Sequence, residues 1–236
     1  MNNIEVCFTP NNYSLFHNND SIVVVIDILR ATSAICTALH HGVKEIIPVA
    51  TVEEARIYQS KGFLAAAERN GEVIEGFAFG NSPFSYMGDE VKDKSIVLTT
   101  TNGTQAVEVA RKAHQVVIGS FLNLDVLCEW LSKQQRDIIL LCAGWKNKFN
   151  IEDTIFAGAV AQKLQNSGKF SSTCDSAIAS MYLYERAASN LFDFLQSSSH
   201  RRRLEKLHLE KDIRYCLTLN TAPVIPVLSG NSLIRL

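Results

Sequence analysis

The sequence predicts an α/β protein with a layered α/β/α sheet, a site at the strand ends, and a smaller C-terminal portion that is helical or α+β. Short β-branched runs alternate with segments of helical periodicity, and polar clusters recur where the runs end. Beyond Gly168 this alternation gives way to a long helical run. We therefore expect a main α/β region over residues 1–168, with residues 169–236 packing on it as a subdomain or as part of one continuous domain.

Composition and charge limit the classes of partner. The chain has 236 residues, of which 47% are hydrophobic, enough for an extensive core. Its 23 basic and 24 acidic residues leave no basic surface of the kind that nucleic-acid backbones require. The N-terminal stretch does not read as a signal segment, and no apolar run approaches the roughly 20 residues that cross a bilayer. We expect a cytoplasmic protein without nucleic-acid or membrane partners; a homodimer stays open.

The six cysteines are scattered through the chain without the paired spacing of a zinc site. Reduced thiols are therefore expected. Cys142 ends a predicted strand, but Lys148 stands six positions further, so the Cys-x5-Arg nucleophile signature is missing. This disfavours a covalent cysteine mechanism and favours a small buried strand residue at Cys142.

The stretch from Ile22 to Asp27 predicts the central strand. Its β-branched run is typical of a parallel strand covered on both faces, and it ends in an acid. Arg30, Thr32 and Ser33 follow, and the two hydroxyls can cap the start of a helix. Charge and free N–H groups then converge where open α/β sheets bind ligands. The structural alternative is that Asp27 caps a turn and pairs with Arg30.

The remaining elements follow in the same alternating order. Further strands are expected at residues 4–8, 44–50, 63–67, 95–98, 115–118, 137–142 and within 221–228. Helices are expected after the first acid and at residues 51–61, 104–110, 123–133, 151–164, 175–196 and 200–210. Residues 72–93 form a long loop whose aromatic side chains predict that it is ordered. The run HRRR at 200–203 is either an anion clasp or a solvated helix face.

Polar clusters follow the predicted strands at residues 27–33, 68–69, 99–104 and 142–153. Because the strands of a doubly wound sheet end on one rim, these residues are expected to line one crevice. Carboxylates there suit a hard cation such as Mg²⁺, and arginines with helix N-termini suit a phosphorylated anion. The chain lacks the GxxxxGKS/T loop and the GxGxxG turn, which argues against an ordinary nucleoside triphosphatase or a Rossmann dehydrogenase.

Six short motifs, taken in order, resemble one known family. They are VVVIDILRATSA, ERNG, GFAFGNSP, TTTNGT, CAG followed by FNIED, and DIRYC with a later VIPVL. The series is similar to that of the 2-phosphosulfolactate phosphatases, the ComB family, and extends over nearly the full chain. The resemblance implies an α/β fold and magnesium-dependent hydrolysis of 2-phosphosulfolactate to sulfolactate and phosphate, a step towards coenzyme M.

The resemblance and the strand-end positions together predict the site residues. The predicted catalytic residues are Asp27, Glu68 and Glu152, and the predicted Mg²⁺ ligands are these three acids with Asp153. The predicted substrate ligands are Arg30, Thr32, Ser33, Arg69, Asn81, Ser82, Thr100, Thr101, Asn102, Gly103 and Thr104. The family pattern is broken where Asn70 replaces a glycine and where Ala78 and Asn220 stand in place of acids. These departures bear on metal affinity and on the exact substrate.

The primary hypothesis is a Mg²⁺-dependent phosphoric monoester hydrolase that acts on 2-phosphosulfolactate or a closely similar phosphorylated small acid. A noncatalytic phosphometabolite-binding protein of the same fold is the alternative from another class, and the missing acids at positions 78 and 220 favour it. A phosphatase with a shifted substrate is the third hypothesis, because sulfonate and carboxylate make similar demands on arginine and amide donors.

Overall fold

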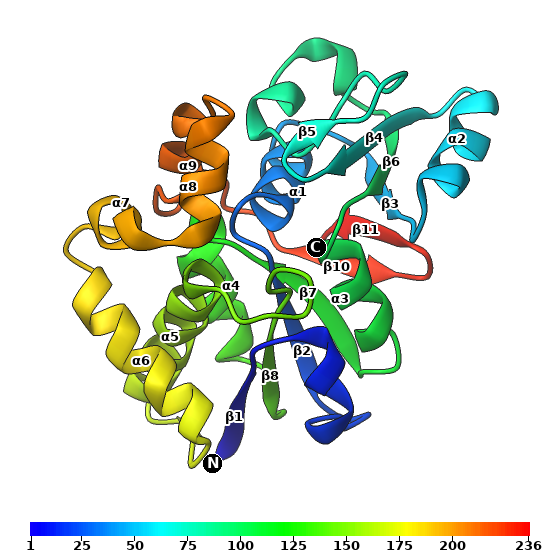
Figure 1. Cartoon of the computed structure of the whole chain (residues 1–236). Coiled ribbons are helices and arrows are strands. Elements are labelled where there is room, and N and C mark those ends of the chain that lie inside the picture. The colour runs from blue at the N-terminus through cyan, green and yellow to red at the C-terminus, as the bar shows by residue number, and fades with distance from the viewer.

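The computed structural model describes all 236 residues and contains one sheet of 11 strands with helices on both faces (Figure 1). The strands are β1 (Asn2–Cys7), β2 (Ile22–Ile26), β3 (Glu45–Pro48), β4 (Leu64–Arg69), β5 (Glu72–Val73), β6 (Ser95–Thr99), β7 (Gln115–Gly119), β8 (Ile138–Cys142), β9 (Phe170–Ser171), β10 (Pro226–Ser229) and β11 (Ser232–Arg235). The helices are α1 (Ala31–His40), α2 (Val52–Ser60), α3 (Gly103–Ala110), α4 (Leu124–Leu131), α5 (Ile151–Asn166), α6 (Asp175–Ala187), α7 (Leu191–Phe194), α8 (Ser199–Lys206) and α9 (Glu210–Cys216). The predicted layered α/β class is confirmed.

Two blocks of parallel strands make up most of the sheet, whose order is β5-β4-β6-β3-β11-β10-β7-β2-β8-β1-β9. One block contains β1, β8, β2 and β7, and the other contains β3, β6 and β4. The C-terminal hairpin of β10 and β11 lies between the blocks and pairs antiparallel with β7 and with β3 (Figure 1). The two blocks therefore run in opposite directions. Their carboxyl ends meet at one cavity from two sides, and not along the single rim that was expected.

β2 is fully buried because helices cover both of its faces. Ile22, Val24 and Ile26 belong to a core that includes residues of α4, α5, α6 and α9. Val23 and Val25 belong to a second core on the other face, with residues of α1 and α3. This alternation follows from the two-residue period of a strand. The acid that follows β2 is thereby held at the end of a strand that cannot move independently.

The start of α1 differs from the prediction. The helix begins directly after Arg30, and no side chain caps it. Thr32 Oγ1 instead accepts a hydrogen bond from the N–H of Asp27 at 3.1 Å, and Ser33 Oγ donates to the carbonyl oxygen of Ile28 at 2.9 Å. The two hydroxyls therefore join α1 to the turn that carries the acid, because that turn has free backbone groups of its own.

α2 and the long loop follow their predictions. Thr51 and Glu54 form a capping box, in which Thr51 Oγ1 accepts from the N–H of Glu54 at 3.1 Å. The loop of residues 72–93 is ordered and includes β5 and two short 3-10 turns. Phe79 and Tyr86 stack within it, with ring centroids 5.9 Å apart. This packing fixes the segment that carries the Gly-Asn-Ser-Pro motif.

The C-terminal portion contributes both helices and strands. The expected helix over 175–196 is divided into α6 and α7, because Asn190 caps α7 by accepting from the N–H of Asp193 at 3.0 Å. The strand expected within 221–228 is β10, whereas β11 has no counterpart among the expected elements. Since the hairpin sits inside the sheet, residues 169–236 complete the sheet that residues 1–168 begin.

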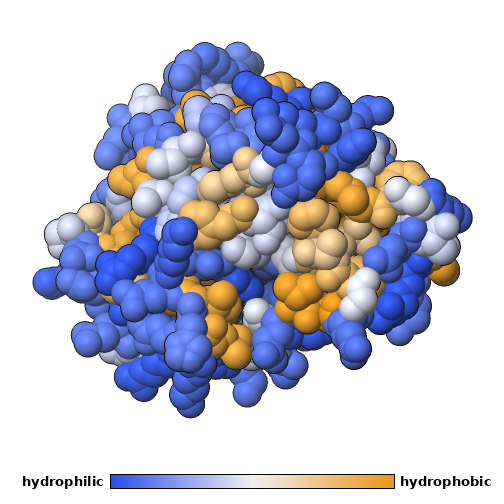
Figure 2. All heavy atoms as spheres, turned by 90° about the horizontal axis from the view of Figure 1, so that it is seen from above, coloured by the Kyte–Doolittle hydropathy of each residue, from blue (hydrophilic) through white to orange (hydrophobic).

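The face of the molecule seen in Figure 2 is mostly polar around its edge, and its apolar residues form separate groups. No helix of the structure combines the length and the apolar character needed to cross a lipid bilayer.

Candidate active site

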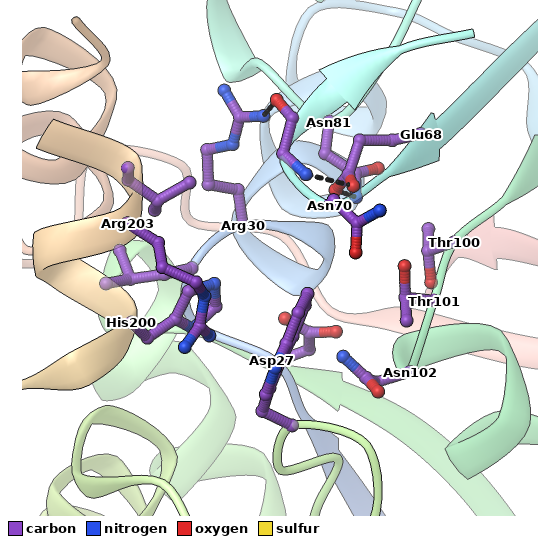
Figure 3. A pocket seen from close by; sticks show the side chains of 14 residues that line it. Asp27, Arg30, Glu68, Asn70, Asn81, Thr100, Thr101, Asn102, His200 and Arg203 are labelled. Atoms are coloured by element: carbon purple, nitrogen blue, oxygen red, sulfur yellow. Dashed lines mark hydrogen bonds between the residues drawn. The ribbon is translucent and has the colours of Figure 1, made fainter. Parts of the chain in front are cut away.

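One small cavity lies where the two strand blocks meet. Its walls come from the ends of β2, β4 and β6, from the loop after β8 and from α8 (Figure 3). The lining residues are Asp27, Leu29, Arg30, Glu68, Asn70, Gly71, Asn81, Thr100, Thr101, Asn102, Trp145, His200, Arg203 and Leu204. The side chains of α8 face the turn after β6 across the cavity, and Asp27 lies between them (Figure 3).

Asp27 is the acid at the centre of the cavity and is only 6% exposed. Burial raises its pKa to about 8; the charges of Asp153 and Glu68 add to this rise, and His200 opposes it. A carboxyl group in such an environment lacks a counter-charge and gains one when a cation enters. Asp27 is therefore suited to bind a cation.

Glu68 ends β4 and is fixed by two hydrogen bonds. Its Oε1 accepts from the N–H of Gly71 at 2.6 Å, and its Oε2 accepts from Nδ2 of Asn81 at 2.8 Å. The Oδ1 atom of Asn81 is buried and has no hydrogen-bond partner. Asn70 has a φ of +59°, a conformation that glycine adopts freely and that asparagine tolerates better than most residues. Asn70 therefore keeps the turn for which the family resemblance expects glycine.

Thr100, Thr101 and Asn102 form the turn between β6 and α3. Thr100 Oγ1 accepts from the N–H of Thr104 at 3.2 Å, and Asn102 Oδ1 accepts from the N–H of Lys146 at 3.0 Å. Thr101 Oγ1 is buried without a hydrogen-bond partner. This hydroxyl and the amide groups at the start of α3 are donors for an anion.

Several predicted substrate ligands support the cavity without lining it, namely Thr32, Ser33, Arg69, Ser82, Gly103 and Thr104. Arg69 donates to the carbonyl oxygen of Glu68 at 2.7 Å and to Thr99 Oγ1 at 3.1 Å, so it joins the ends of β4 and β6. A Cβ atom on Gly103 would lie 3.0 Å from Oδ2 of Asp27, so glycine allows the turn to approach the acid. The predicted ligands that do line the cavity are Arg30, Asn81, Thr100, Thr101 and Asn102.

Arg30 lines the cavity but is already paired. Its Nη1 donates to Oδ1 of Asp212 at 2.7 Å, and its Nη2 donates to the carbonyl oxygen of Gly71 at 2.9 Å. Both partners of the ion pair are nearly buried, with side-chain exposures of 4% and 10%. Arg30 is therefore paired with an acid of α9. The structural alternative, in which Arg30 pairs with Asp27, is wrong.

Glu152 and Asp153 are fully buried beside the cavity and do not line it. The Asp153 carboxylate accepts from the N–H groups of Ile28 at 2.9 Å and Gly144 at 3.1 Å, and from Nδ2 of Asn150 at 2.9 Å. Burial raises the pKa of Asp153 to about 8, and the charge of Glu152 adds to the rise. Asp153 thus ties together the loops that follow β2 and β8.

Glu152 binds His200 of α8. His200 Nδ1 lies 2.6 Å from Oε1 of Glu152, and Ser198 Oγ donates to Oε2 at 3.3 Å. Burial acts to raise the pKa of Glu152, but the hydrogen bond and the charge of His200 outweigh it, so the pKa is lowered. Glu152 is therefore an anion that keeps a proton on Nδ1 and leaves Nε2 for the cavity. The imidazole ring also lies against Trp145, with ring centroids 5.4 Å apart.

α8 supplies lining residues that were not among the predicted site residues. His200 and Arg203 line the cavity, whereas Arg202 is exposed and Arg201 is buried over the ring of Phe192 at 3.7 Å. Residues three positions apart lie on one helix face, so His200 and Arg203 face the cavity while Arg202 faces solvent. The three-residue spacing of His200 and Arg203 is the signal in the sequence that could have distinguished the cavity side of the helix from its solvated side.

The four predicted metal ligands do not form one cluster. No group of three or more His, Cys, Asp or Glu side chains is arranged so that it could hold a metal ion. Asp27 and Glu68 do face the cavity, where Oδ1 of Asn81 and Oγ1 of Thr101 have no hydrogen-bond partner. This set of oxygen donors fits Mg²⁺, which keeps several waters and takes one or two carboxylates together with phosphate oxygens.

Two of the three positions that depart from the family pattern, Ala78 and Asn220, lie outside the cavity lining, whereas Asn70 lines it. Ala78 is exposed, and Asn220 Nδ2 donates to Oδ2 of Asp125 at 2.8 Å. Cys142 is fully buried, and its pKa is raised by burial and by the charge of Asp153. A second hollow of about 760 Å³, between β3 and α3, is lined by no strand-end acid.

Carboxylates, free hydroxyl and amide donors, and cationic side chains around one small cavity are typical of an enzyme of the α/β class that binds a small anion. The sequence pattern of a family described as 2-phosphosulpholactate phosphatase matches residues 7–231. Proteins named probable 2-phosphosulfolactate phosphatase from Caldanaerobacter subterraneus subsp. tengcongensis, Thermotoga petrophila and Clostridium acetobutylicum are 43%, 42% and 36% identical to the chain. These matches cover 90%, 87% and 89% of this chain and 89%, 88% and 91% of those proteins.

The chain therefore belongs to the 2-phosphosulfolactate phosphatase family, a family of phosphoric monoester hydrolases. The predicted family and the predicted enzyme class are both confirmed.

Proposed function

We propose that the chain is a Mg²⁺-dependent phosphatase that hydrolyses 2-phosphosulfolactate, or a closely similar phosphorylated small acid, to the hydroxy acid and phosphate. The observation that carries the proposal is the arrangement of charge in the cavity. Asp27 and Glu68 provide carboxylates, and Arg203 provides a cationic group beside the imidazole of His200 on the wall of α8. A multiply charged ester needs both kinds of group, because the cationic side chain offsets its negative charge and the carboxylates hold the cation bound to it.

Asp27 is the principal candidate to hold Mg²⁺, with Glu68 and the free oxygen atoms of Asn81 and Thr101 around the ion. Bound there, Mg²⁺ would neutralise phosphate charge and orient water for attack. The raised pKa of the buried Asp27 supports this role, because a divalent cation would offset the repulsion from Asp153 and Glu68.

The turn of Thr100, Thr101 and Asn102 would bind the phosphate oxygens. Its hydroxyl groups and the amide groups at the start of α3 are donors that develop no charge of their own. The contact of Gly103 with Asp27 places this turn beside the acid, so one phosphate group can reach both.

His200 would donate a proton to the leaving oxygen. Water attacks phosphorus, the bond between phosphorus and the ester oxygen breaks, and the ester oxygen takes the proton from Nε2 of His200. The attacking water releases a proton to solvent, and His200 is reprotonated from solvent. Glu152 is a positioning residue in this step, because it holds Nδ1 and does not line the cavity.

The proposed setting of this reaction is the cytoplasm, as a step towards coenzyme M in an organism that makes it. Its support is the family membership of the chain, since the relatives carry the name of that activity.

The experiment is to measure phosphate release from 2-phosphosulfolactate with and without Mg²⁺. We expect Mg²⁺-dependent release that Asp27→Asn abolishes and that Arg202→Met, on the exposed side of α8, leaves unchanged. No release above background at high protein concentration would overturn the phosphatase proposal for this substrate. Thermal stabilisation by phosphorylated acids without turnover would then favour a noncatalytic binding protein.

A further inference from the structure

Arg203 is a cation in the cavity that lacks an anionic partner. Its guanidinium carbon lies 4.1 Å from the centre of the Trp145 ring, which supports one face of the group. Nη2 of Arg203 is buried and has no hydrogen-bond partner, although a guanidinium carries five N–H donors. An unpartnered charged donor of this kind is costly unless an acceptor arrives from outside the chain.

The two buried arginines of the chain have internal partners, whereas Arg203 is partly buried. Arg30 is paired with Asp212, and Arg201 donates from Nε to Glu205 at 2.7 Å. Arg203 differs, since burial lowers its pKa and the charge of Glu152 only partly opposes this. The fold therefore satisfies the neighbouring guanidinium groups and leaves this one for a ligand.

The position of Arg203 separates it from the proposed phosphate site. α8 forms the wall opposite the turn of Thr100, Thr101 and Asn102, with Asp27 between them (Figure 3). Because both walls line the same small cavity, a molecule of a few carbon atoms bound there would lie next to both of them. A phosphate bound at the turn would thus direct the remainder of the ester toward Arg203.

We propose that Arg203, supported by Trp145, is a specificity residue that binds the second acidic group of the substrate. That group is a carboxylate or a sulfonate, since both accept hydrogen bonds from a guanidinium fork. This inference rests on the proposed function. It assigns the recognition of that second acidic group to one residue of α8.

The test uses four esters that share one carbon skeleton. Propan-2-yl phosphate carries no second acid, 2-phospholactate adds the carboxylate, 1-sulfopropan-2-yl phosphate adds the sulfonate, and 2-phosphosulfolactate carries both. For the unmodified protein we expect kcat/KM to be higher by at least about tenfold for esters with a second acid, as for one charge-assisted hydrogen bond. Of the two esters with a single second acid, the one with the higher kcat/KM identifies which acid Arg203 binds.

The decisive variant is Arg203→Met, with Arg202→Met as the matched control on the exposed face of α8. We expect R203M to lose the preference for acidic esters, while its kcat/KM for propan-2-yl phosphate stays within about threefold. Arg203→Lys keeps the charge without the planar fork and should recover part of the preference. An equal loss for all four esters, or an unchanged preference in R203M, would overturn the proposal.

Binding of sulfolactate separates this inference from the proposed function, because sulfolactate has both acids and no phosphoryl group. Titration calorimetry should show at least about tenfold weaker binding of sulfolactate to R203M than to R202M. Equal affinity in the two variants would refute the subsite. If no ester is hydrolysed but this difference is found, the phosphatase proposal fails and the Arg203 site stands.

Discussion

His200 Nδ1 lies 2.6 Å from Oε1 of Glu152, so a fully buried acid at the start of α5 fixes the orientation of an imidazole in the cavity. The two residues are 48 positions apart in the chain. Their hydrogen bond ties α8 to α5, and it connects the Glu-Asp pair recognised in the sequence to a histidine that was not among the predicted site residues.

The first prediction concerns this pair. Glu152→Gln removes the charge that holds the imidazole but keeps the side-chain shape, so kcat should fall by about 10- to 100-fold with little change in KM. His200→Asn should have a larger effect on kcat. The pH dependence of kcat is the distinguishing readout, because E152Q should alter the pH profile if Glu152 acts through the imidazole. A uniform loss at every pH would mean that Glu152 has a purely structural role.

The second prediction concerns the stability cost of Asp27. Its pKa is raised to about 8 in the folded protein by burial and by nearby acids. The ionisation of Asp27 therefore lowers the free energy of unfolding progressively as pH rises from the ordinary pKa of an aspartic acid toward 8. Without divalent cations, Asp27→Asn should raise the melting temperature, with a gain at least about 3 °C larger at pH 8 than at pH 5.

Thermal unfolding of both proteins at the two pH values checks this expectation. The same scans with Mg²⁺ should stabilise the unmodified protein and leave D27N unchanged. A D27N protein with the same pH response as the unmodified chain would contradict the electrostatic account of Asp27.

The third prediction concerns the ion pair of Arg30 and Asp212. Asp212→Asn leaves a nearly buried guanidinium without its counter-charge, which should lower the free energy of unfolding by about 3 kcal/mol. Glu129→Gln is the control, since the pair of Glu129 with Lys133 is exposed and should contribute less than about 0.5 kcal/mol. Urea denaturation measures both values. Equal, small effects would show that the Arg30 pair is not a buried contact.

The fourth prediction excludes a thiol nucleophile. Cys142 is fully buried and its raised pKa disfavours the thiolate, so Cys142→Ala should keep kcat/KM within about twofold. The unfolding free energy should fall by about 1 kcal/mol, as for other small core deletions. Steady-state kinetics after treatment with iodoacetamide gives an independent check. Loss of activity in C142A without loss of folding would support covalent catalysis.

Local sequence signals predicted most of the elements. The β-branched run before Asp27 forms a buried strand, the Thr51 capping box begins α2, and the aromatic loop of residues 72–93 is ordered. The placement of β10 and β11 between the two strand blocks could not be predicted in this way. It depends on pairings with β7 and β3, which lie more than a hundred residues earlier in the chain, and no short pattern encodes such contacts.

The candidate site was predictable to a similar degree. Acids and hydroxyls at strand ends were found, and Asp27, Glu68 and the Thr100 turn do line the cavity, although the two strand blocks bring them there from opposite directions. The separate environments of Glu152 and Asp153 were not visible, because both acids follow the same loop and differ only in their tertiary partners. Arg203 was hidden in a run of charges whose faces become distinct only once the helix is placed.

The most direct measurement is a crystal structure of the protein with Mg²⁺, phosphate and sulfolactate. The account predicts the ion at Asp27, phosphate at the turn of Thr100, Thr101 and Asn102, and an acidic group of sulfolactate at Arg203. Phosphate bound away from this turn, or an ion bound away from Asp27, would contradict it.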